Sequence, residues 1–175
     1  MTSEEVLPME ASAIREKEGK NPGLNKYLTF TLGEEEYGLD ILMVKEIIGM
    51  LDITRVPRLP DFVLGVINLR GKIIPVVDLR RKFGLEPQED TKETCIIVVD
   101  LGRTLMGMRV DRVSEVLDLA PEDIEDTPSF GAEVQTDFIT GMGKAGERVI
   151  MLLDISRVLT GEELEAVSGC YRQEG

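Results

Sequence analysis

The sequence contains no histidine and no tryptophan, and it has two cysteines in 175 residues. Without histidine, the Ser-His-Asp and Cys-His nucleophile systems are excluded, together with the commonest zinc ligand. Cys95 and Cys170 are far apart and form no CxxC pair, which is typical of a chain from a reducing compartment. We therefore expect no cofactor and no metal, and the composition argues against an enzyme.

Positive charge is also scarce. Twenty lysines and arginines face 33 acidic residues, and the formal net charge is −13. A chain this acidic repels phosphate backbones, so nucleic acid is not an expected partner. No apolar run approaches the roughly 18 residues of a membrane span, and the N-terminus is too acidic for a secretory signal. These absences predict a cytoplasmic protein that does not insert into the membrane.

The most informative stretch runs from Gly65 to Leu79 and is typical of a β-hairpin. Apolar runs at residues 66–67 and 73–77 flank the turn-forming sequence Asn68-Leu69-Arg70-Gly71. Pro75 cannot donate a ladder hydrogen bond, so we expect the second strand to lie at a sheet edge or to carry a bulge. Leu69 and Arg70 fall at the expected tip, where core packing does not explain them and functional contacts are common.

The chain also repeats itself. Residues 27–48 align with residues 96–117 at an offset of 69, and residues 62–81 align with residues 138–157 at an offset of 76. Matching glycines and apolar residues recur in the same order in both halves, which favours an internal duplication over chance. The copies differ at the hairpin tip, because Asn68-Leu69-Arg70-Gly71 is matched by Lys144-Ala145-Gly146-Glu147.

Each copy holds about five short strands, so we expect a mainly β fold of two small five-stranded barrels in tandem, with a few short helices. The first barrel is expected over residues 26–88, with the C-terminal segment as a candidate to close it. The second is expected over residues 93–158, after a linker near Pro87–Thr94. Residues 1–25 are predicted to be a flexible acidic tail, and residues 159–175 a C-terminal helix and tail.

Three segments resemble the CheW-like domain family of bacterial chemotaxis coupling proteins. They are the hairpin of residues 65–79, the run from Tyr37 to Ile47, and the sequence Val110-Asp111-Arg112-Val113. The resemblance covers residues 26–167. It implies two SH3-like barrels and a non-catalytic adaptor that couples transmembrane chemoreceptors to the histidine kinase CheA. An alternative is a regulatory CheW-like module of a related two-component or motility pathway.

The resemblance also implies which surfaces meet which partners. The cytoplasmic hairpin tip of the receptor would lie against the groove between the barrels, at the positions Val44, Glu46, Thr54, Leu69 and Arg70. The regulatory domain of CheA would join at a barrel end, with Leu64 and Gly65 as the weaker candidates. The chain would be a monomer when isolated, and it would associate with membrane receptor arrays through these partners.

Several of these residues have a simpler structural interpretation. Arg70 suits bidentate capture of a partner carboxylate, but it could also be a solvated turn residue. For Val44, core packing and lining of the groove are equally supported interpretations. Glu46 is either a local ion-pair partner or a charge at the groove edge.

Two further motifs point to other functions, and both are weak. Residues 141–146 match GxGxxG, but a dinucleotide site needs a helix after the glycines, and the following residues are strand-like. Asp123, Glu125 and Asp126 form an acidic cluster without the spacing of a calcium loop. A fragment of the kinase itself is disfavoured, because the chain has no room for a kinase core.

Overall fold

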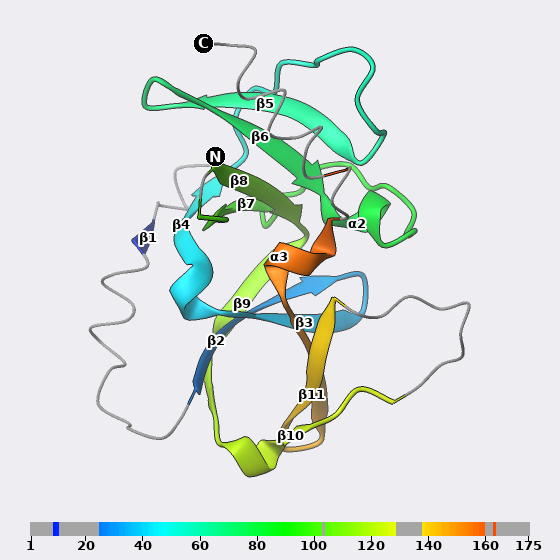
Figure 1. The fold of residues 1–175 in the computed structure, drawn as a ribbon. Helices are drawn as coiled ribbons and strands as arrows, with labels where there is room; N and C mark the ends of the chain where they lie inside the picture. The colour runs from blue at the N-terminus through cyan, green and yellow to red at the C-terminus, as the bar shows by residue number, and fades with distance from the viewer. Residues whose placement is uncertain (1–8, 11–24, 103, 129–137, 160–162, 164–175) are drawn as a thin grey trace.

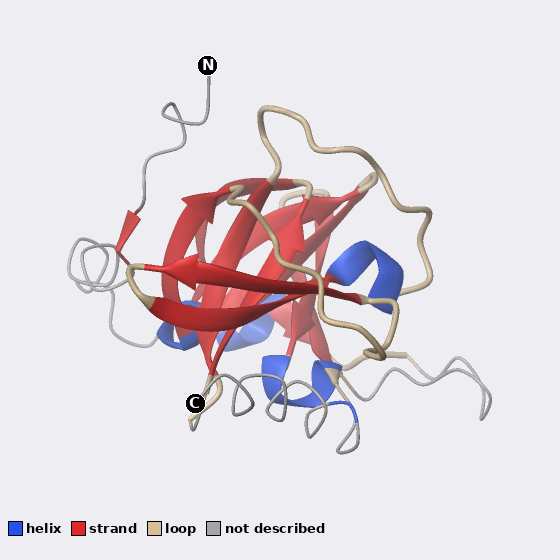
Figure 2. Cartoon of the chain, turned by 90° about the horizontal axis from the view of Figure 1, so that it is seen from above, coloured by secondary structure: helices blue, strands red, loops and turns tan. Residues whose placement is uncertain are grey.

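The computed structural model describes residues 9–10, 25–102, 104–128, 138–159 and 163. Its strands form two sheets of six, which appear one above the other in Figure 1. Figure 2 shows how few and short the helices are beside the strands. The predicted fold class, mainly β with an SH3-like arrangement in two halves, is therefore confirmed.

Each sheet combines long strands with one two-residue strand at an edge. The first sheet runs in the order β1 (Met9–Glu10), β4 (Val44–Gly49), β7 (Cys95–Asp100), β8 (Leu105–Val110), β6 (Lys72–Asp78) and β5 (Val63–Leu69). The second runs in the order β10 (Ile124–Glu125), β11 (Ile139–Ala145), β12 (Arg148–Leu153), β3 (Glu35–Asp40), β2 (Asn25–Leu32) and β9 (Arg112–Leu119).

Among the described residues, four short helical segments lie between or directly after the strands. They are η2 (Ile41–Met43), α2 (Leu79–Lys82), η3 (Pro121–Asp123) and α3 (Ile155–Val158). Asp78 and Asp154 each begin a helix in the same way, because their carboxylates accept a hydrogen bond from the backbone N–H two residues later. These two aspartates are 76 residues apart, so the capping supports the repeat.

The predicted barrel boundaries are wrong, because strands are exchanged between the two copies. The first sheet contains β4 to β8 and is built from residues 44–110, and we call it the contiguous barrel. The second takes β2 and β3 from the start of the chain and β9 to β12 from its second half, and we call it the split barrel. The segment near Pro87–Thr94 therefore joins strands of one barrel. The chain crosses between barrels at η2 and at Asp111.

Two parallel strand pairs make this exchange. In the contiguous barrel β6 pairs with β8, and Val76 lies opposite Gly107; in the split barrel β12 pairs with β3, and Leu152 lies opposite Gly38. Val76 and Leu152 are separated by the repeat offset of 76, and Gly38 and Gly107 by the offset of 69. A Cβ on Gly107 would lie 2.8 Å from the Ile96 side chain of β7, so glycine leaves the room that this side chain occupies. The duplication is thus confirmed in the topology.

The central strands are buried on both faces. Ile96 and Val98 of β7 pack inside the contiguous barrel, whereas Cys95, Ile97 and Val99 face a larger core shared with the split barrel. This arrangement explains the uninterrupted apolar run at residues 95–99. Burial raises the pKa of the Cys95 thiol to about 11, so the thiol stays neutral and serves as a core side chain.

The prediction for Pro75 is also wrong. β6 is an interior strand between β5 and β8, and Pro75 lies opposite Val66 of β5. The ladder with β8 begins one residue later, at Val76. Proline is therefore tolerated in an interior strand because the neighbouring strand does not pair with that residue.

The N-terminal end of the chain departs from the expected tail. Met9–Glu10 forms β1 and pairs with β4, although residues 1–25 were predicted to be a flexible tail. The rest of that tail lies outside the described residues. So does the predicted C-terminal helix, except for Glu163, which is helical. The Glu163 carboxylate lies 3.0 Å from the Lys82 ammonium on α2 of the contiguous barrel.

An ion pair fastens the two barrels where the chain crosses at Asp111. Arg80 on α2 donates from Nε and Nη2 to the Asp111 carboxylate at 2.8 and 2.7 Å. Gly33, in the β2–β3 turn of the split barrel, donates its N–H to the same carboxylate at 2.7 Å. Burial acts to raise the pKa of Asp111, but the hydrogen bonds from Arg80 and Gly33 outweigh it and hold that pKa below its ordinary value.

We predict that Asp111→Asn lowers the free energy of unfolding by about 3 kcal/mol at pH 7. Breaking a buried pair leaves Arg80 without its countercharge, and the estimate is at the low end because a fifth of the Asp111 side chain remains exposed. The pKa of Asp111 is lower in the folded protein than in the unfolded chain. The stabilisation from its charge is therefore complete above the ordinary pKa of aspartate and is lost as the pH falls through the pKa of Asp111 in the folded protein. Urea unfolding at several pH values measures it.

The difference between the natural chain and Asp111→Asn should be constant near neutral pH and should shrink below about pH 4. Glu125→Gln is the control, because it removes a carboxylate from an exposed ion pair with Lys144 and should change stability little. A difference that persists unchanged to pH 2 would contradict the assigned role of the Asp111 charge.

Candidate functional site

The tip of the β5–β6 hairpin is a two-residue turn formed by Arg70 and Gly71. Both have positive φ, 53° and 86°, as a tight hairpin turn requires. The Asn68 side chain accepts a hydrogen bond from the Gly71 N–H at 2.8 Å and stabilises the turn. Arg70 is therefore held in an unfavourable backbone region at an exposed tip, which is a feature common at functional sites.

The Arg70 side chain reaches back to Glu46 on β4. Nη2 of Arg70 donates to both carboxylate oxygens of Glu46, at 2.8 and 2.6 Å. The Glu46 side chain is 12% exposed, whereas that of Arg70 is 58% exposed. The structure thus brings together two of the predicted site residues, and it places Glu46 as the local ion-pair partner that was one of its two interpretations.

The Arg70 guanidinium is only partly used by this pair. Among the described residues, the N–H groups on its Nε and Nη1 make no hydrogen bond. Arginine offers five donors in a rigid fork, and Glu46 occupies one nitrogen. The unused N–H groups can donate to a second carboxylate while Nη2 stays bound to Glu46.

The other predicted contacts divide into buried and exposed residues. Val44 is 2% exposed and belongs to the core shared by the barrels, and Leu69 packs partly against the core inside the contiguous barrel. Two residues before Val44, Leu42 in η2 is 69% exposed. The sequence argument missed Leu42, although Ile41 and Val44 at helical spacing leave Leu42 off the apolar face.

Thr54 and Gly65 meet in the backbone. Thr54 exchanges two backbone hydrogen bonds with Val66, at 2.8 and 2.9 Å, and this bridge connects the segment after β4 to β5. Gly65 has φ +145°, and an added Cβ would overlap the Thr54 carbonyl group. Gly65 therefore has a framework function in the structure, while the Thr54 side chain is exposed.

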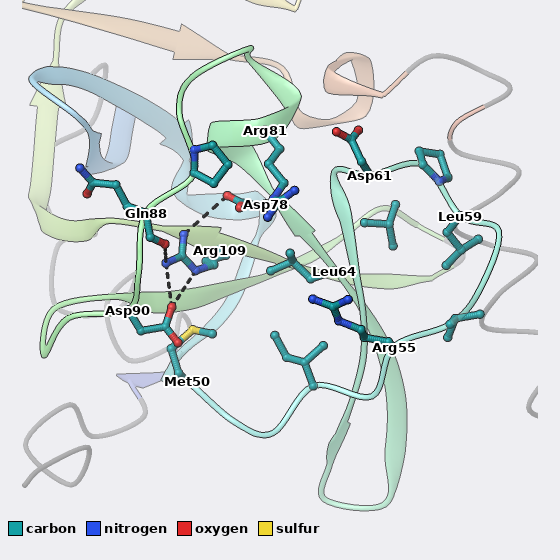
Figure 3. A pocket seen from close by; sticks show the side chains of 15 residues that line it. Met50, Arg55, Leu59, Asp61, Leu64, Asp78, Arg81, Gln88, Asp90 and Arg109 are labelled. Carbon is teal, nitrogen blue, oxygen red and sulfur yellow. Dashed lines mark hydrogen bonds and ion pairs between the residues drawn. The ribbon is translucent and has the colours of Figure 1, made fainter.

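Leu64 lines a cavity of about 460 Å³ at the opposite end of the same hairpin. Figure 3 shows this cavity, with apolar side chains such as Met50, Leu59 and Leu64 beside charged ones. Arg55 also lines it, is exposed, and makes no ion pair with any described residue. An apolar wall with an unpaired cation is typical of a protein-binding surface.

A buried arginine holds one wall of this cavity in place. Arg109 on β8 donates from Nη2 and Nε to the Asp90 carboxylate at 2.7 and 3.0 Å, and from Nη2 to the Gln88 carbonyl at 2.8 Å. Its Nη1 lies 3.6 Å from the Asp78 carboxylate (Figure 3). The loop after α2 is thereby fixed to the barrel. A lone charge within the apolar strand of residues 105–110 was the signal that could have predicted this.

Comparison with known proteins decides the family. The family model described as the CheW-like domain matches residues 26–163. The chain belongs to the CheW-like domain family. The predicted resemblance is therefore confirmed.

Several CheW relatives align over most of their length. A chemotaxis protein CheW from Klebsiella aerogenes is 45% identical over 142 residues, which cover 81% of this chain and 86% of the relative. One from Helicobacter pylori is 35% identical over 150 residues and covers 86% of this chain and 90% of the relative.

A solved structure agrees with the fold. The crystal structure of the scaffolding protein TtCheW from Thermoanaerobacter tengcongensis has a TM-score of 0.73 and 36% identity, covering 80% of this chain and 95% of that chain. The CheW-like chain is accordingly a non-catalytic scaffold of chemotaxis. None of the helices in the described residues is long and apolar enough to cross a membrane.

The weaker motifs do not form sites in this CheW-like chain. Residues 141–145 of the GxGxxG match lie in β11, and β12 follows the turn at Gly146, so no helix begins there. Glu125 pairs with Lys144 at 2.7 Å across β10 and β11. Within the described ranges, no cluster of cysteine and acidic residues is arranged to hold a metal.

We predict that Gly65→Ala lowers the free energy of unfolding by about 2–5 kcal/mol, because the new Cβ meets the Thr54 backbone at a strained φ. Gly71→Ala is the matched control. Gly71 also has positive φ, but no atom lies within 4 Å of an added Cβ, so the cost should be about 1 kcal/mol. Urea unfolding of both variants makes the comparison, and equal losses would argue against the close approach.

Proposed function

We propose that this chain couples the cytoplasmic hairpin tip of chemoreceptors to the regulatory domain of the kinase CheA. Membership of the CheW-like family supports the general role. The Arg70–Glu46 pair supports the assignment of surfaces, because it presents unused donors at an exposed tip. On this proposal the protein acts in the cytoplasm, at the receptor tips, and it is a monomer until its partners are present.

The receptor contact would centre on Arg70. A carboxylate on a receptor helix would accept a hydrogen bond from one of the unused N–H groups, on Nε or on Nη1, while Nη2 stays on Glu46 and fixes the direction of the guanidinium plane. Leu42 would supply an apolar contact at the junction of the barrels. Val44 would anchor the end of η2 in the shared core, and Leu69 would anchor the hairpin tip by packing against the core of the contiguous barrel. Thr54 completes the group of five predicted positions as an exposed neighbour.

The kinase contact would lie at the other end of the hairpin, around the cavity lined by Leu64 and Arg55. Gly65 would contribute through the backbone bridge that shapes this end. The apolar wall would take an aliphatic side chain from the partner, and Arg55 would attract an acidic residue beside it. The two contacts are then made by opposite ends of β5 and β6, so one chain can hold both partners at once.

We predict that Arg70→Glu weakens binding to a soluble receptor tip fragment by about 2–5 kcal/mol. The reversed charge repels the partner carboxylate and also Glu46. Calorimetry measures the binding, and thermal melting checks the fold. Lys144→Glu is the matched control, because it makes the same charge change at the hairpin end of the other copy.

The expected pattern is a large loss of receptor binding with a small effect on CheA binding. Arg70→Lys should keep part of the affinity, because it retains the charge without the fork. A melting midpoint that falls while receptor binding is unchanged would show that Arg70 is structural. Full recovery by the double variant Glu46→Arg, Arg70→Glu would show that only the internal pair matters.

We predict that Arg55→Glu slows association with the CheA regulatory domain roughly tenfold at low salt, because an unpaired cation steers an acidic partner. Arg58→Glu is the control: Arg58 is exposed in the same loop but does not line the cavity. Stopped-flow association at two salt concentrations measures the effect. Equal slowing by both variants would show that net charge, and not the position of Arg55, controls association. If neither variant slows association, the cavity is not part of the kinase contact.

A further inference from the structure

The outer edge of β4 is covered by the N-terminal segment of the same chain. β4 pairs with β7 on one side, and on its other side it pairs antiparallel with β1. Figure 1 shows β1 beside β4, far in sequence from the strands that complete that barrel. An exposed sheet edge is a template for another strand, so its occupant decides what else can bind there.

The corresponding edge of the other barrel has no such cover among the described residues. β9 corresponds to β4 in the repeat, and it ends its sheet. β9 has charged residues at positions 112, 115 and 118, which discourage strand addition by themselves. β4 has the sequence VKEIIG, in which Val44, Ile47 and Ile48 are buried apolar residues. Its edge differs from that of β9 in having the Met9–Glu10 strand beside it.

The register places the cover at the proposed receptor contact. Met9 lies opposite Ile47, and Glu10 lies opposite Glu46. Glu46 is also the residue that Arg70 holds, with 2.6 Å between Nη2 and the Glu46 carboxylate. The edge that β1 occupies therefore includes a residue of the proposed receptor contact.

We propose that the β4 edge is a strand-docking surface occupied in cis by Met9–Glu10, and that this occupancy competes with the receptor tip at Glu46 and Arg70. The second part rests on the proposed function. The Met9–Glu10 strand then acts as an internal competitor that lowers receptor affinity until it is displaced.

The test compares Glu10→Pro with Glu4→Pro in the full-length chain. Both variants remove one negative charge and add one proline to the same segment, but only residue 10 lies in the pairing with β4. Proline removes a backbone donor and disrupts a strand pair. Amide hydrogen exchange of the segment 44–49 measures cover of the edge, and calorimetry measures binding of a receptor tip fragment.

We expect Glu10→Pro to increase exchange in residues 44–49 and to strengthen binding of the receptor fragment roughly two- to tenfold, with Glu4→Pro unchanged. Equal exchange in both variants would overturn the docking of β1. Faster exchange without stronger binding would overturn the competition. If even the unsubstituted chain fails to bind the fragment, the proposed function has failed, while the exchange comparison still decides whether the edge is covered.

Discussion

Parallel pairing between the two copies is the constraint on which the structure depends. Neither copy can complete a barrel alone, because β6 needs β8 and β12 needs β3. A glycine lies opposite the incoming strand in each exchange, at Gly107 or Gly38, and leaves room for the neighbouring side chains. The exchange buries the central strands on both faces and creates the shared core. The Arg80–Asp111 ion pair then fixes the barrels to each other where the chain crosses between them.

Local sequence patterns predicted the strands and turns well, but they could not predict which distant strands pair with each other. The hairpin of β5 and β6 and the two repeat offsets can be recognised from the order of residues alone. Strand exchange cannot, because β8 and β3 are at equivalent places in the repeat and share the glycine of Gly107 and Gly38, and local pattern does not show which of them pairs with β6. Pro75 was assigned to an edge or a bulge because it lacks a ladder donor, and the sequence does not show that pairing with β8 begins only at Val76. Chain order suggested that each copy closes on itself, and the parallel ladders show otherwise.

The candidate site could be predicted where one residue differs from its counterpart in the repeat. Arg70 differs from its counterpart in the other copy, and that difference directed attention to the hairpin tip. Its pairing with Glu46 could not be predicted from the sequence, because the two residues are 24 positions apart and come together only when the contiguous barrel has folded. The hairpin itself separates the two proposed contacts. Leu64 and Arg70 lie near opposite ends of a seven-residue strand, roughly 20 Å apart, and the buried side chains of β5 and β6 keep that spacing rigid.

The nesting of one barrel inside the sequence of the other has a consequence for the order of folding. All the long strands of the contiguous barrel have been synthesised once residue 110 is made, so that barrel can form while synthesis of the rest continues. The split barrel must wait, because β3 ends at Asp40 and its parallel partner β12 begins at Arg148. Closing so long a loop is slow, and until then the β3 edge that pairs with β12 has unpaired backbone groups. The stretch of synthesis between β3 and β12 is therefore the period in which this chain is most exposed to aggregation.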